Sequence, residues 1–245
     1  PPRSTLFPYT TLFRSRPASG KSEVIDCLKK TSAIERCERY HIGLIDEIDD
    51  FPMLWTWFEE DAILAKILHK PHIHTDPDGY FLYQYQWHLL IERMGMDYQK
   101  KLRDQADYHN EHTTLVEFSR GSEHGGYKEA FPHLSLDILR GAAILYIDVS
   151  YEESLRKNRR RFNPNKPDSI LEHGLPDAKL EKLYRHVDWQ EVSQPSPTHV
   201  EIRGIQVPYV VLHNEPELTD DVKKLAPALE THLQTLWQLY GKSGS

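Results

Sequence analysis

The sequence RPASGKS at residues 16–22 decides how this chain is interpreted. Its last three residues complete the second half of the pattern G-x-x-x-x-G-K-[ST], which is typical of phosphate-binding loops. In such a loop, backbone N–H groups from about Ser19 to Ser22 surround a phosphate at the start of a helix. We therefore expect Ser19, Gly20, Lys21 and Ser22 to bind ATP. Lys21 would bridge the β- and γ-phosphates, and the Ser22 hydroxyl would reach Mg²⁺.

The pattern places its first glycine at position 15, where this chain has Ser15. Residues 1–15, PPRSTLFPYTTLFRS, can be back-translated to a common short-read sequencing adapter. We interpret them as adapter-derived and leave them out of the functional reasoning; the alternative is a natural leader. On this interpretation the first strand is missing, although residues 10–13 have the β propensity for a surrogate strand. Ser15 is then expected to be strained if its φ must be positive.

Apolar segments alternate with amphipathic segments along residues 16–240. Strands are predicted at 40–45, 113–118, 142–149, 199–203 and 207–213, and the main helices at 23–30, 54–68, 80–102, 152–161, 177–185 and 219–239. Strands separated by helices predict a three-layer α/β fold, with a mostly parallel sheet of about five strands and helices on both faces. We expect one domain over 16–240, a lid at about 152–190 and a tail at 241–245.

Ligands bind such sheets at the carboxyl ends of the strands, so chemistry-bearing residues at strand ends are the candidates for a site. The sequence EFSRGS at residues 117–122 follows the strand predicted at 113–118. Glu117 is expected to hold magnesium or to accept a proton, and Arg120 to reach a phosphate or a substrate anion. The alternative for Glu117 is a structural acid that caps the next turn.

Four carboxylates, Asp46, Glu47, Asp49 and Asp50, follow the strand predicted at 40–45. One of them is expected to be the base that deprotonates an acceptor hydroxyl. The others are expected to cap the helix predicted at 54–68, since an acid followed closely by proline is a typical helix start. A structural role is the alternative for each carboxylate taken singly.

The sequence ESLRKNRRRF at residues 153–162 is rich in arginine. Arg156, Arg159 and Arg160 share one face at helical spacing, and arginine is suited to bidentate contact with phosphate. We expect these three residues to be catalytic arginines that neutralise charge during phosphoryl transfer. The alternatives are a solvated basic face and a contact with RNA.

The composition narrows the class of partner. The net charge is −7 over 245 residues, which argues against a general nucleic-acid binder. Two cysteines make no disulfide framework and suggest a reducing, cytoplasmic compartment. No apolar run reaches the roughly 18–20 residues of a membrane span, so no membrane partner is expected. The 14 histidines show no spacing typical of a transition-metal site.

Several features, in this order along the chain, resemble P-loop kinases of the nucleoside and nucleotide kinase group. They are RPASGKS, the acidic end of the second strand, EFSRGS after the third, the arginine-rich helix after the fourth, and VPYVVLHN at residues 207–214. EFSR is similar to the E-R-S element of deoxynucleoside kinases, with its arginine displaced. The resemblance implies ATP and Mg²⁺, Asp46 or Glu47 as the base, and lid arginines within 156–161.

The sequence therefore predicts an ATP- and Mg²⁺-dependent phosphotransferase. Its phosphoryl acceptor is a small molecule, with a nucleoside or nucleotide as the expected class. Two alternatives remain open. One is a nucleotide-binding regulatory ATPase without an acceptor, and the other is an RNA-contacting protein that uses its arginine face.

Overall fold

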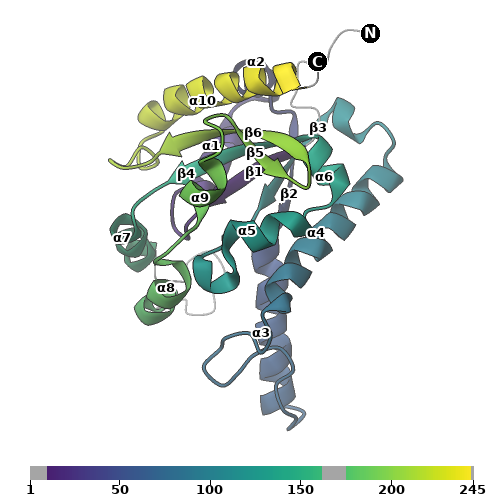
Figure 1. Cartoon of the computed structure of the whole chain (residues 1–245), viewed down its shortest axis with the longest axis vertical. Helices are drawn as coiled ribbons and strands as arrows, with labels where there is room; N and C mark the ends of the chain where they lie inside the picture. The colour runs from purple at the N-terminus through teal and green to yellow at the C-terminus, as the bar shows by residue number, and fades with distance from the viewer. Residues whose placement is uncertain (1–9, 162–174, 244–245) are drawn as a thin grey trace.

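The computed structural model describes residues 10–161 and 175–243. Its six strands form one sheet in the order β2-β3-β1-β4-β6-β5 (Figure 1). The strands are β1 (Thr10–Ser15), β2 (Leu44–Asp49), β3 (His112–Glu117), β4 (Ala142–Asp148), β5 (His199–Ile202) and β6 (Ile205–His213). Every neighbouring pair is parallel except β5 and β6, which pair antiparallel. The α/β class and the mostly parallel sheet are confirmed, and the sheet has one strand more than expected.

Helices cover both faces of this sheet. They are α1 (Lys21–Lys30), α2 (Ala33–Tyr40), α3 (Asp50–Lys66), α4 (Tyr85–Asp104), α5 (Gly126–Ala130), α6 (Leu136–Arg140), α7 (Tyr151–Arg161), α8 (Asp177–Tyr184), α9 (Trp189–Ser193) and α10 (Val222–Ser243). One apolar cluster joins the sheet to α1 and α10, and another joins it to α4, α5, α6 and α9. Figure 1 shows α10 and α2 on one side of the sheet and α4 and α5 on the other.

The alternation of side chains along β4 explains the two clusters. Ile144 and Tyr146 pack in the cluster with α4 and α5, whereas Leu145 and Ile147 pack in the cluster with α1 and α10. Successive side chains of a strand point to opposite faces, so a strand covered on both faces is a continuous apolar run. The segment AAILYID therefore predicts an interior strand, and the structure places it between β1 and β6.

Strand β1 lies at the centre of the sheet, between β3 and β4. Leu12 is fully buried, and Ser15 lies opposite Ile147 of β4. The backbone strain expected at Ser15 is absent, because positive φ angles in this region occur at Ala18 (54°) and Gly20 (109°) instead. A strand can therefore run through position 15 without a glycine, and the left-handed residues come later in the loop.

Helix α2 and the start of β2 differ from the prediction. The segment 40–45 was predicted as a strand, but α2 extends to Tyr40 and β2 begins at Leu44. The buried face of α2 consists of Arg36 and Tyr40. The buried Arg36 guanidinium has hydrogen-bond partners, because it donates to the carbonyl oxygens of Leu28, Thr31 and Gly43. Ala33, Ile34 and Cys37 also lie at helical spacing, but they line an open hollow at the surface, so the apolar stripe of α2 is not its buried face.

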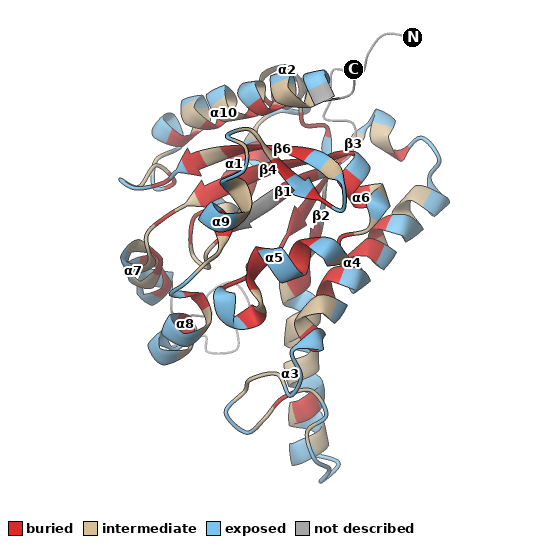
Figure 2. Cartoon of the chain, in the orientation of Figure 1, coloured by how far each residue is buried: buried red, intermediate tan, exposed pale blue. Residues whose placement is uncertain are grey.

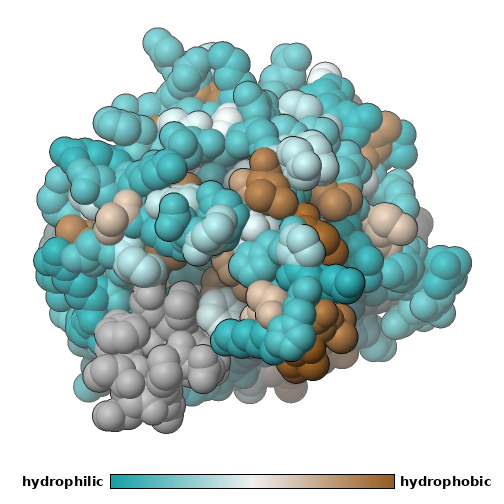
Figure 3. Space-filling model, turned by 90° about the horizontal axis from the view of Figure 1, so that it is seen from below, coloured by the Kyte–Doolittle hydropathy of each residue, from teal (hydrophilic) through white to brown (hydrophobic). Residues whose placement is uncertain are grey.

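Helix α3 and residues 67–84, which we term the arm, project away from the sheet (Figure 1). Figure 2 shows the outer part of the arm mostly in the colours of intermediate and exposed residues. The buried carboxylate of Asp61 accepts hydrogen bonds from the backbone N–H groups of Ile73, His74 and Thr75, which fixes residues 67–84 against α3. In the view from below, brown apolar side chains gather in one area of a mainly teal surface (Figure 3).

Within residues 10–161 and 175–243, no helix is both long enough and apolar enough to cross a bilayer.

Candidate functional site

The loop of residues 16–20 connects the central strand β1 to α1. Gly20 is the N-cap residue of α1 and has a φ of 109°, which favours glycine. A Cβ atom at this position would lie 2.7 Å from both the Asn214 Nδ2 and the Thr219 Cγ2 atoms. Glycine is therefore required at position 20 for two reasons. Its backbone conformation favours glycine, and the segment that follows β6 approaches too closely for a side chain.

Neighbouring elements hold this loop in place. Asn214 Nδ2 donates to the carbonyl oxygen of Ser19 over 2.7 Å, and Ser154 Oγ donates to the carbonyl oxygen of Pro17 over 2.8 Å. The Ser19 hydroxyl is buried and has no hydrogen-bond partner among the residues that the structure describes. A buried hydroxyl without a partner is costly. This loop is fixed by its neighbours and begins a helix. A phosphate group bound there would accept hydrogen bonds from the N–H groups of the helix start and from this hydroxyl.

Lys21 and Ser22 occupy the first turn of α1, next to Ser19 and Gly20. The structure therefore brings the four predicted nucleotide-binding residues together at one helix N-terminus. The Lys21 ammonium group donates to Ser119 Oγ over 2.8 Å, across the sheet edge at the end of β3. Ser22 is exposed at the same turn. The lysine thus points toward the strand-end residues rather than into solvent.

A group of carboxylates lies at the ends of β2 and β3. Asp49 ends β2 and is paired in register with Glu117, which ends β3 and is buried. Burial raises the pKa of Asp49 to about 7, and the charges of Asp50 and Glu117 add to the effect while Lys21 opposes it. Asp49 is also the N-cap of α3, since its Oδ1 atom accepts from the Phe51 N–H over 3.0 Å.

The two carboxylates expected to act as the base lie elsewhere. Because β2 runs to Asp49, Asp46 and Glu47 lie within the strand and not after it. Asp46 accepts from the Tyr108 hydroxyl over 2.6 Å and pairs with Lys101, whereas Glu47 pairs with Lys29. The predicted end of the strand was therefore wrong, because the strand predicted at 40–45 is observed at Leu44–Asp49. The assignment of the base to Asp46 or Glu47 came from the family resemblance and stays a prediction. Asp49 and Asp50 are the acids at the sheet edge.

Arg120 is buried and makes contacts other than those expected. Its Nη1 atom donates to Asp50 Oδ2 over 2.7 Å and to the Ser119 carbonyl oxygen, and its Nη2 atom donates to the Trp87 carbonyl oxygen. The guanidinium also lies over the Trp87 and Phe118 rings. Through these bonds Arg120 joins the end of β3 to α3 and α4.

The arginines of α7 are engaged by carboxylates. Arg156 and Arg160 both donate to Glu217 over 2.7 Å, and Arg159 donates to Asp177 over 2.6 Å. Partial burial raises the pKa of Glu217, but hydrogen bonds from Arg160, Arg156 and Lys157 outweigh it and lower this pKa to about 2. The predicted common face is therefore divided between two acids. The middle of the predicted lid, residues 162–174, lies outside the described residues.

The acids at the sheet edge do not form a metal site by themselves. Within the described part of the chain, no group of three or more His, Cys, Asp and Glu residues is arranged to hold a metal ion. Mg²⁺ in phosphoryl-transfer sites usually has one or two protein ligands, and phosphate oxygens and water complete its shell. Ser22 lies in the first turn of α1 and Glu117 at the end of β3, and they stay the residues predicted to provide such a partial shell.

Helix α8 contacts the arm beside this site. Lys179 Nζ donates to the Gly79 carbonyl oxygen over 3.2 Å, and Lys182 Nζ lies 4.0 Å from the centre of the Tyr80 ring. Gly79 in turn packs against Phe58 of α3. The arm and the segment that follows α7 are therefore connected by polar and cation–π contacts.

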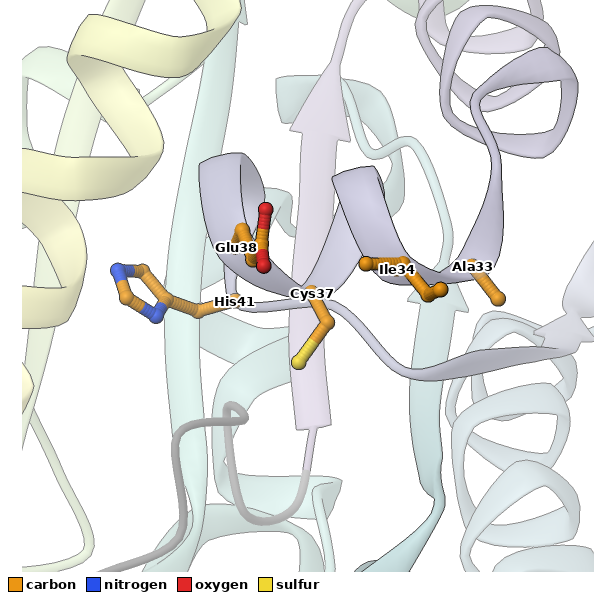
Figure 4. A pocket seen from close by; sticks show the side chains of 5 residues that line it. All are labelled: Ala33, Ile34, Cys37, Glu38 and His41. Carbon is orange, nitrogen blue, oxygen red and sulfur yellow. The ribbon is translucent and has the colours of Figure 1, made fainter.

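The surface of the described residues includes two open hollows. One, of about 820 Å³, is lined by Asp49, Met53, Lys101 and neighbouring residues of β2, α3 and α4. The other, of about 650 Å³, is formed by α2 residues and His41, with none of the site residues in its wall (Figure 4). Only the first hollow adjoins the candidate site.

Sequence reasoning missed two residues that shape this site, Asn214 and Glu217. Asn214 is the last residue of VPYVVLHN and directly follows the buried strand β6, so its place at the carboxyl edge of the sheet was a signal. Glu217 had no signal, because its cationic partners lie about 60 residues earlier in the chain.

Comparison with known proteins adds little to this geometry. No protein-family model matches the chain, and no curated protein matches it. Among solved structures, the crystal structure of APE1195 is similar, with 14% sequence identity and a TM-score of 0.42 over 92% of this chain and 96% of that one. A similarity this low carries no argument about the site.

Proposed function

We propose that this chain is an ATP- and Mg²⁺-dependent phosphotransferase with a P-loop NTPase-like fold. Its acceptor is a hydroxyl group of a small molecule, with a nucleoside or nucleotide as the class that the sequence resemblance implies. The observation that carries the proposal is the meeting of Lys21 with Asp49 and Glu117 at one sheet edge. The pKa of Asp49 in this group is about 7.

The loop of residues 16–20 is the proposed phosphate site. Its backbone and the N-terminus of α1 provide N–H groups and a positive dipole end. Lys21 adds a full charge, which neutralises charge on the β- and γ-phosphates as the γ-phosphoryl group is transferred. In this state Lys21 exchanges its bond to Ser119 for bonds to phosphate oxygens. Bound Mg²⁺, held by Ser22 and Glu117, would supply further charge neutralisation.

Asp49 is the proposed general base. A carboxyl group with a pKa of about 7 is about half ionised at neutral pH, which suits a residue that must accept a proton. In the reaction the acceptor oxygen forms a bond to the γ-phosphorus and the bond to the ADP oxygen breaks. The proton of the acceptor hydroxyl passes to Asp49.

The first test measures ADP release from ATP and Mg²⁺ in the presence and absence of a panel of nucleosides and nucleotides. We expect release that depends on the acceptor and falls about 100-fold or more in Lys21→Ala. Lys29→Ala is the matched control, because it removes a lysine of the same helix that pairs with Glu47 at the surface. Acceptor-independent release would support a regulatory ATPase instead, and no release in any condition would refute both enzymes.

An RNA-binding role has less support from the contacts. RNA binding through α7 would need an excess of positive charge, whereas Glu217 and Asp177 neutralise part of this face and the whole chain has a net charge of −7.

A further inference from the structure

Three cationic side chains of α7 converge on the single carboxylate of Glu217. Arg156 and Arg160 each approach it within 2.7 Å, and Lys157 Nζ lies 3.2 Å from its Oε1 atom. Arg156 is also held by two bonds to Glu153, whereas Glu217 is the acid to which Arg160 donates. Arg160 therefore depends on Glu217 more than Arg156 does.

This cluster adjoins the loop of residues 16–20 from two directions. Ser154, one turn before the cationic residues, donates to the Pro17 carbonyl oxygen. Lys157 lies 3.3 Å from the hydroxyl of Thr219, and Thr219 is the residue that a Cβ at Gly20 would strike. The Glu217 carboxylate thus occupies cationic groups beside the loop where we propose that phosphates bind.

We propose that Glu217 is an intramolecular competitor of the nucleotide phosphates, an autoinhibitory contact that holds Arg160 until an anionic ligand displaces it. The inference rests on the proposed function and adds regulation of the same site. A carboxylate and a phosphate present similar oxygen acceptors to a guanidinium, so one can replace the other without rebuilding the site.

The burial of the partners decides which group moves. The side chains of Glu217 and Lys157 are 11% and 5% exposed, whereas that of Arg160 is 54% exposed. Ion pairs that involve an exposed arginine are weak and exchange readily, whereas a buried pair that is broken leaves an uncompensated charge. Glu217 therefore stays anchored on Lys157, and Arg160 is the group that turns toward the phosphates.

The test is the affinity of the full chain for ATP with Mg²⁺, measured by calorimetry. Glu217→Gln keeps the size of the side chain and removes its charge, and we expect it to bind ATP about tenfold more tightly. The gain should disappear in the double variant Glu217→Gln/Arg160→Gln. Glu35→Gln is the control: it removes one negative charge from a surface pair with Arg39 on α2 and should change the affinity less than twofold.

Inorganic tripolyphosphate serves as a second probe, because it has the phosphate charges without the base. The ratio of affinities between Glu217→Gln and the parent chain should be the same for both probes. Unchanged or weaker binding by Glu217→Gln overturns the inference. If this variant does not fold, Glu217→Asp is used, with about threefold tighter binding expected and unchanged binding overturning the inference. No ATP binding by the parent or any variant would instead refute the proposed function itself.

Discussion

Asp49→Asn is expected to make the protein more stable and inactive at the same time. The pKa of Asp49 is about 7 in the folded chain, whereas a carboxyl of this type in an unfolded chain has a pKa of about 3.9. Ionisation therefore opposes folding, and this cost rises as the pH increases from about 4 to 7 and is constant above it. Asparagine has no such cost, and it retains the N-cap bond to Phe51 because it is also a good N-cap residue.

The difference between the two pKa values sets an upper limit of about 4 kcal/mol for the stabilisation at pH 8. Asp49 is only half-buried, so solvent screening should reduce the gain to about 1–2 kcal/mol. Urea unfolding at pH 4.5 and pH 8 measures this gain. The free energies of unfolding of Asp49→Asn and the parent chain should be nearly equal at pH 4.5, and the variant should be more stable at pH 8. Phosphoryl transfer should fall by about 100-fold or more. Equal stabilities at pH 8, or retained activity, would refute the assignment of Asp49 as a base with a raised pKa.

Three further substitutions test other parts of the site. Arg120→Gln should lower the free energy of unfolding by about 3–5 kcal/mol, because it leaves the buried Asp50 carboxylate without its cation; a loss under 1 kcal/mol in chemical denaturation would contradict this. Glu117→Gln should reduce kcat strongly with the circular dichroism spectrum unchanged, and an unaltered rate would make Glu117 structural. Ser15→Ala should raise the free energy of unfolding by about 1 kcal/mol, because the Ser15 hydroxyl is buried and lacks a partner among the described residues; a lower melting temperature would argue for a hydrogen bond at that hydroxyl.

The fold could be predicted from sequence where local pattern and burial agree. The segment AAILYID is apolar at every position but the last, and the strand predicted at 142–149 is confirmed as β4 (Ala142–Asp148), which is buried on both faces of the sheet. Helix α2 was not predicted, although Ala33, Ile34, Cys37 and Tyr40 lie at helical spacing. Its buried face could not be predicted, because it includes Arg36, whose partners are backbone carbonyls. Hydrophobic periodicity locates an apolar stripe, and it does not locate an arginine that is buried through hydrogen bonds.

The candidate site shows the same division. The helix start at residues 19–22 could be predicted, because its pattern lies in consecutive positions of the sequence. The end of β2 was predicted wrongly, because strand ends are the least reliable part of such a prediction, and all four acids were therefore placed after the strand. The partners of the α7 arginines could not be predicted, since Glu217 reaches them only through the tertiary fold.

The contact between α8 and the arm lies part of the way along α3, so a rotation of α3 about its first residue moves this contact less than it moves the far end of the helix. Its fulcrum is Asp50, held by Arg120, and the 17 residues of α3 span about 25 Å from that point. Phe58, which packs against Gly79, lies about 12 Å along this length. A rotation of about 10° at the fulcrum would therefore displace the Lys182–Tyr80 contact by about 2 Å and the far end of α3 by about 4 Å. The contact would break at the smaller displacement, so a motion too slight to disturb the acids at the base of the arm would still separate the arm from α8.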